Sequence, residues 1–138
     1  MTSTKVTDAH GALVEDHRRL HGLVKRLREA QEPAELATVL SELHEALTRH
    51  FREEESPGGL YDALGVCVPE FREQLGEMVD DHYRIAAGIR DLRDRVQGPL
   101  GGVPDELIGE ARRLADHLVW HERREHELVD AAAAAAKG

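Results

Sequence analysis

Apolar residues recur every three or four positions along four long stretches of this chain, a spacing that predicts amphipathic helices. The predicted helices cover residues 8–30, 33–55, 69–97 and 104–130. Pro33 and Pro104 suit the first turn of a helix, and residues 56–59 (SPGG) stop the second helix. Residues 60–68 are predicted to be irregular or to contain a short helical turn, and residues 131–138 form an alanine-rich tail.

The links between the first and second helices and between the third and fourth are short, which favours antiparallel neighbours. The sequence therefore predicts an all-α fold, an up-down-up-down antiparallel four-helix bundle. A chain of 138 residues is long enough to bury one hydrophobic core, so we expect a single domain over residues 1–138.

Each of the four apolar stripes contains a histidine where a helix normally carries Leu, Val or Ile, and two stripes add a glutamate one turn later. The six residues are His17, His50, Glu54, His82, His121 and Glu125. Burying such groups without partners costs on the order of several kcal/mol each. Counted along the helices from the two short links, the histidines of each half lie within about one turn of the same height. The pattern thus predicts that these side chains converge in the bundle interior.

The chemistry of this set points to a dinuclear metal site. Residues four apart share a helix face, so a histidine can bind one cation end-on while the glutamate one turn on bridges to a second. Two such pairs and two further histidines give a four-His, two-Glu site with two nitrogens for each ion. Mixed nitrogen and oxygen ligation favours iron, followed by manganese or zinc.

The charge and cysteine content of the chain limit the kinds of molecule and compartment that it suits. The formal net charge is −9 and no basic block is present, so nucleic acid and anionic membranes are poor partners. Cys67 is the only cysteine, so no disulfide can form within the chain. Neither a secretory-type amino terminus nor an apolar run of membrane-spanning length is found, and we expect a cytoplasmic protein.

Other polar and aromatic residues are predicted to lie outside the metal site. Histidines at the edges of the stripes are expected to be solvated or to assist from outside: His10, His21, His44, His117 and His126. Glu53 and Glu55 are expected to be exposed charges, and Trp120 a packing residue. Surface or packing roles are expected for Tyr61 and Tyr83, although the sequence leaves open whether His21 or either tyrosine joins the metal shell.

Four segments of the chain resemble the hemerythrin-like, or HHE cation-binding, family over about residues 10 to 130. They are EDHRRLHGL, HFREEESPGGLYDAL, DDHYRI and WHERREHEL. The resemblance implies a four-helix bundle that holds two iron ions as an oxo- or hydroxo-bridged, non-haem di-iron centre. It also implies the ligands: His17 and His50 for one iron, His82 and His121 for the other, and Glu54 and Glu125 as bridges.

Two positions depart from the oxygen-carrying hemerythrins. Those proteins place a second histidine four residues after the ligand of the third helix, where this chain has Ala86. They also use an aspartate five residues after the histidine of the fourth helix, where this chain has His126, and Glu125 fits the inward face better. One iron thus gains an open position beside residues 86–88. This favours peroxide or nitric oxide chemistry, or iron or oxygen sensing, over simple oxygen carriage.

The leading hypothesis is therefore a di-iron protein that binds or reacts with dioxygen, hydrogen peroxide or nitric oxide. The alternative is an iron-binding sensor or storage module without turnover, and the sequence leaves open whether the protein is an enzyme, for example a catalase-like one. A histidine phosphotransfer bundle would need an exposed imidazole, whereas the four stripe histidines face inward. The Glu-x-x-His pairs of ferritin-like sites and the H-E-x-x-H motif of zinc hydrolases are absent.

Overall fold

The computed structural model describes residues 2–98 and 104–137, and every regular element within them is helical. The elements are α1 (Thr2–Gly11), α2 (Val14–Glu29), α3 (Pro33–Glu55), α4 (Leu60–Cys67), the 3-10 helix η1 (Pro69–Phe71), α5 (Arg72–Gln97) and α6 (Pro104–Lys137). The predicted all-α class is confirmed. None of the helices in the described residues combines the length and apolarity needed to cross a bilayer.

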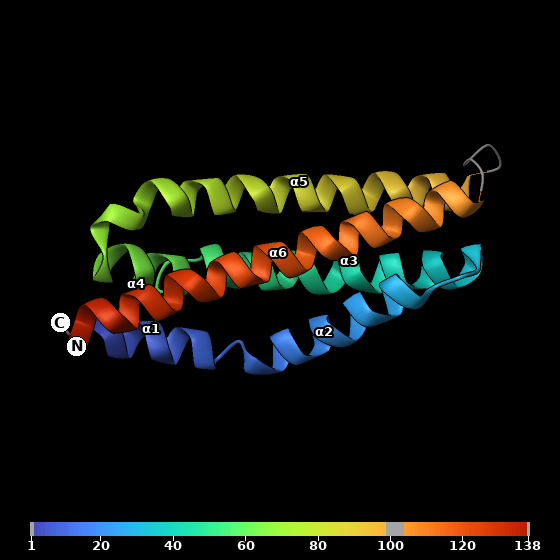
Figure 1. Ribbon diagram of the computed structural model, residues 1–138. Helices are drawn as coiled ribbons and strands as arrows, with labels where there is room; N and C mark the ends of the chain where they lie inside the picture. Colours follow the sequence, from blue (N-terminus) through green and yellow to red (C-terminus); the bar gives the residue numbers. More distant parts are fainter. Residues whose placement is uncertain (1, 99–103, 138) are drawn as a thin grey trace.

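The long helices α2, α3, α5 and α6 run side by side along the molecule (Figure 1). Helix α3 packs against α2 and α5, and α6 packs against α5 and α2. The short helices α1 and α4 contact each other and lie at the end of the molecule where both termini are found. The link between α2 and α3 lies at the opposite end.

Helix α3 spans the residues predicted for the second helix, and its end is fixed by two glycines. Gly58 has a φ of 79°, a backbone conformation that favours glycine. A Cβ atom at Gly59 would lie 2.4 Å from the carbonyl oxygen of Glu53, so a side chain there would clash with the last turn of α3. This tight turn ends α3 immediately after Glu54 and Glu55.

The prediction of one continuous helix over residues 8–30 is wrong, because this segment is divided between α1 and α2. The backbone amides of Ala12 and Leu13 donate hydrogen bonds to the carbonyl oxygens of Asp8 and His10, respectively, which closes a turn, and α2 begins after this turn. Leu13 is buried in the turn, together with Val6 from α1, which anchors α1 against its neighbours. The physical reason is tertiary: α1 gains burial against α4 and α6 by leaving the line of α2.

The other boundaries agree closely with the prediction. The segment 60–68 contains α4, and the third predicted helix begins with η1 before α5. Helix α6 continues through the alanine run to Lys137. Residues 99–103, between the third and fourth predicted helices, and Gly138, the end of the predicted tail, lie outside the described residues.

Two clusters of buried apolar residues divide the core along its length. The larger contains leucines of α2, α3 and α6 with Ile85 and Ile89 of α5. The smaller lies where α1, α4 and the start of α5 meet the end of α6. Along α3, α5 and α6 the buried polar residues fall between these clusters. They are His50, Glu54, Asp81, His82, His121 and Glu125.

Candidate metal centre

Six side chains from four helices meet in this polar layer: His17 from α2, His50 and Glu54 from α3, His82 from α5, and His121 and Glu125 from α6. They form two overlapping groups, and within each group one candidate ligand atom per residue lies within 4.8 Å of all the others. One group combines His17 and His50 with both glutamates, and the other combines His82 and His121 with the same glutamates. The shared carboxylates are thus placed between two pairs of imidazoles.

The Glu54 carboxylate tests whether this arrangement fits a cation. Its residue is 0% exposed, and neither carboxylate oxygen has a hydrogen-bond partner. The nearest imidazole nitrogens lie 3.3 Å away on His50 and 3.4 Å away on His82. Leaving a buried acceptor unsatisfied costs about 1 to 3 kcal/mol, and more for a charged group. A cation between the two histidine pairs would supply the missing partner, so the residues fit a bound metal.

Three of the histidines are held from behind by carboxylates. In each case the contact is made by Nδ1, the ring nitrogen that faces away from the other candidate ligands. Nδ1 of His50 lies 3.4 Å from Asp16, Nδ1 of His82 lies 2.8 Å from Glu55, and Nδ1 of His121 lies 2.6 Å from Asp81. The other nitrogens point inward, and the Nε2 atoms of His82 and His121 lie 3.1 Å apart. A carboxylate on one ring nitrogen fixes the tautomer and orientation of the imidazole, which leaves the other nitrogen free to bind metal.

Tyr61 lies inside the centre, although the sequence favoured a surface or packing role for it. Its residue is 6% exposed, and its hydroxyl group donates a hydrogen bond of 2.8 Å to Glu125. The same oxygen lies 2.9 Å from Nε2 of His82, the nitrogen that faces the other candidate ligands. Phe51 stacks on the His82 ring with 3.7 Å between ring centroids. Tyr61 therefore adds an oxygen at the edge of the donor set.

Burial and neighbouring charges set the protonation of the metal-free centre. Burial, together with the charge of Glu125, raises the pKa of Glu54 well above its usual range. Burial also acts to raise the pKa of Glu125, but its polar neighbours Glu54, His17 and Tyr61 outweigh this and lower it. Metal binding would favour the deprotonated form of Glu54, since metal ligands must be deprotonated.

The lowered pKa of His82 makes the stability of the metal-free protein depend on pH. Burial, then the neighbouring His121, lowers the pKa of His82 from 6.5 to about 3. Between these values the unfolded chain holds a proton on His82 that the folded protein excludes. The contribution of neutral His82 to stability is therefore complete above about pH 6.5 and is lost as the pH falls toward 3.

We expect the metal-free wild type to unfold at a lower urea concentration at about pH 5 than at about pH 7, with a smaller difference for His82→Gln. Urea titrations followed by circular dichroism at both pH values measure this. An equal loss of stability in both proteins would contradict the assignment of this proton to His82.

Asp81 was not singled out by the sequence, yet it holds two histidines. It lies 2.6 Å from Nδ1 of His121 and 2.8 Å from Nε2 of His117. We expect Asp81→Asn to weaken metal binding about 10- to 100-fold, because His121 loses the charge that orients its ring. Competition with a chelator of known affinity measures the change, and Asp80→Asn, at the exposed neighbouring position, is the matched control. Equal affinities in the two variants would contradict this role.

Three further residues considered in the sequence analysis, His21, Tyr83 and Trp120, are exposed and lie outside the group of six converging side chains. The His21 side chain is 74% exposed and pairs with Glu122, and Tyr83 and Trp120 are 69% and 54% exposed. Glu55 is exposed, as expected, and its carboxylate also lies 2.8 Å from Nδ1 of His82.

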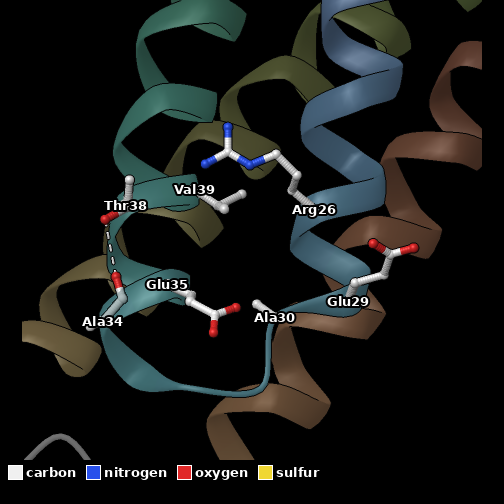
Figure 2. Close-up of a pocket in the computed structure, with 7 residues that line it drawn as sticks. All are labelled: Arg26, Glu29, Ala30, Ala34, Glu35, Thr38 and Val39. Atoms are coloured by element: carbon white, nitrogen blue, oxygen red, sulfur yellow. Dashed lines mark hydrogen bonds between the residues drawn. The ribbon is translucent and has the colours of Figure 1, made fainter.

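Two hollows differ in their relation to the centre. A small cavity of about 20 Å³ adjoins it and is lined by Leu20, Val24, Leu47, Phe51 and Leu118 together with four of the candidate ligands. This volume holds a molecule about the size of water. An open pocket at the link between α2 and α3 (Figure 2) lies at the other end of the helices and contains none of the six residues. The side chains of Arg26 and Glu35 border it, and no histidine does.

A family model described as the hemerythrin HHE cation-binding domain matches residues 8–133, a range that includes all six converging side chains. The match confirms the resemblance seen in the sequence motifs. Comparisons with curated proteins and with solved structures gave no match.

Proposed function

Because the chain belongs to the hemerythrin HHE cation-binding domain family, we propose that its buried His/Glu cluster holds two iron ions that bind or react with dioxygen, hydrogen peroxide or nitric oxide. In this proposal His17 and His50 bind one ion, His82 and His121 bind the other, and Glu54 and Glu125 bridge them. The observation that carries the proposal is the fully buried Glu54 carboxylate, which has no hydrogen-bond partner and stands between two pairs of imidazoles.

The donor set supports iron over manganese or zinc. Each ion would have two imidazole nitrogens and two shared carboxylates, a mixed set that suits iron and leaves positions for an added ligand. When bound, a reduced iron pair supplies the electrons and vacant positions needed to bind and reduce an O–O bond. The phenol oxygen of Tyr61, beside His82 and Glu125, is the protein group best placed to add a further ligand or to donate a hydrogen bond there.

The protein's own residues favour a small ligand. The cavity beside the centre combines five apolar side chains with ionisable side chains of the centre, and its volume of about 20 Å³ limits an occupant to a molecule about the size of water. A second opening, next to His82, is bordered by Ala86, which occupies far less space than an imidazole. Both features support reaction with a small molecule rather than a centre closed by protein ligands.

We also propose the up-down-up-down topology for the four long helices. Its support is the short link between α2 and α3 and the position of that link at the end opposite to the termini (Figure 1).

The alternative is an iron sensor or store in which occupancy stabilises the fold and nothing is turned over. The burial of the Glu54 and Glu125 carboxylates favours it, because a cation that compensates them links metal binding to folding. Both functions use the same metal centre, so they differ only in whether a small molecule reacts there.

Metal analysis of protein purified without chelators tests the proposal. We expect two iron ions per chain and a visible absorption band that changes on addition of peroxide or nitric oxide. Two zinc or manganese ions per chain would overturn iron, and the absence of bound metal would overturn the centre itself.

A cavity-filling variant separates the two functions. Val24→Phe places a ring in the cavity, so we expect iron content to be unchanged and the reaction with peroxide or nitric oxide to slow at least about tenfold. Val96→Phe, at another half-buried valine packed on the same core, is the matched control. If iron-loaded wild type reacts with none of these molecules, the sensor or storage function is the correct one.

A further inference from the structure

A second group of histidines lies at the edge of the metal centre. The ring centroids of His10 in α1 and His126 in α6 are 4.9 Å apart, with the rings edge to face. Both rings lie close to His17, with centroid distances of 5.5 Å for His10 and 6.1 Å for His126. Three imidazoles from three helices thus form a chain that leads from the surface to a proposed ligand.

The break in the first predicted helix creates this group. Because the chain turns after Gly11, α1 leaves the line of α2 and packs against α4 and α6. The buried side chains of Val6 and Leu13 hold it there. This packing brings His10 next to His126.

The group lies where the centre is least covered. The His17 side chain is 14% exposed, whereas the side chains of His50, His82 and Glu125 are at most 5% exposed. The other approach, beside His82, is less suited to a cation. There the outer nitrogen of His82 contacts Glu55, and the surface pocket is bordered by the positive charge of Arg52.

We propose that His10 and His126 form a capture site for divalent transition-metal cations, which then pass to the centre through His17. The inference rests on the proposed function for its destination. Imidazole nitrogens bind Fe²⁺, Co²⁺, Ni²⁺ and Zn²⁺ well. Asp130, one helical turn after His126, adds a negative charge that acts on His10.

The pair offers a cation only two protein ligands, one imidazole nitrogen each from His10 and His126, and so suits brief binding during transfer rather than storage. Water fills the rest of the coordination shell of a cation held by His10 and His126, so its affinity stays below that of the enclosed centre. Transfer requires only that imidazole and carboxylate ligands replace bound waters, and the oxidation state of the metal does not change. The partly exposed His17 ring is the next ligand on this route, since it lies beside the pair and belongs to the buried group.

Uptake kinetics test the route. Metal-free wild type and the double variant His10→Gln/His126→Gln are mixed anaerobically with Fe²⁺, samples are quenched with excess chelator at set times, and the iron retained in the centre is measured. We expect the double variant to fill about tenfold more slowly, because a local site that concentrates cations raises the association rate, and to reach the same final content. His21→Gln/His44→Gln, which removes two histidines outside the group, is the matched control. Equal rates in all three proteins would overturn the proposal.

A direct binding measurement keeps the proposal testable even if the centre itself takes up no iron. Paramagnetic Ni²⁺ is added below one equivalent to the Glu54→Leu variant, whose centre lacks the oxygen donor common to both groups of candidate ligands, and broadening of the histidine ring signals is followed by nuclear magnetic resonance. We expect the signals of His10 and His126 to broaden at lower Ni²⁺ concentration than those of His21 and His44. Equal broadening of all four would overturn the capture site, whereas a wild type without iron in the centre would overturn only the proposed function.

Discussion

Glu54→Leu is expected to abolish the binding of both metal ions and, at the same time, to stabilise the metal-free protein. Both groups of candidate ligands contain Glu54, so its loss removes an oxygen donor from each ion. Without metal, the same carboxyl group is 0% exposed and has no hydrogen-bond partner. Replacing it by an aliphatic side chain of similar size removes an unsatisfied buried group, which raises the free energy of unfolding by about 1 to 3 kcal/mol.

Two measurements check the opposite signs of these effects. Metal content is determined after loading with excess Fe²⁺ and desalting, and the free energy of unfolding is measured by urea titration of metal-free protein. Glu53→Leu is the matched control, since Glu53 is the exposed neighbour in the same helical turn. A Glu54→Leu variant that retained two ions, or that was less stable than metal-free wild type, would contradict the role assigned to Glu54.

The sequence located the six converging side chains because each leaves a local signal. A histidine or glutamate in an otherwise apolar stripe is visible from helical periodicity alone, as at His82 between Met78 and Ile85. The spacing of four between His50 and Glu54 then places both on one face. Helix α3 begins and ends at its predicted residues because Pro33 and the glycines after Glu55 define its limits locally.

The supporting residues left no such signal. Asp81 directly precedes His82 in the sequence, but it is rotated about 100° from His82 around the helix and so lies off the apolar stripe. Its contact with His121 depends on how α5 and α6 pack. Tyr61 lies in α4, a helix of 8 residues that is too short to show a clear period. The break between α1 and α2 was missed for a related reason: no proline marks it, and its stabilisation comes from contacts with α4 and α6. Tertiary packing, and not local pattern, decides these features.

Removal of bound metal is expected to lower the stability of the wild-type protein by about 4 kcal/mol for each ion when free metal had been present at a thousand times its dissociation constant. The physical reason is the composition of the layer between the two apolar clusters. The carboxylates of Glu54 and Glu125 are both buried there, beside the imidazoles of His17, His50, His82 and His121. A cation compensates this negative charge in the folded state alone, so its binding free energy becomes folding free energy.

Urea titrations of the iron-loaded protein with and without a chelator measure this difference. We expect the midpoint to fall with little change in slope, because the surface exposed on unfolding stays nearly the same. Loss of protection from hydrogen exchange should be greatest at the end of α3 and in the middle of α6, where four of the six side chains are anchored. The Glu54→Leu variant should be insensitive to the chelator, since it lacks the donor shared by both ions. An unchanged midpoint in wild type that has released two ions would mean that the helices hold this polar layer together without help from metal.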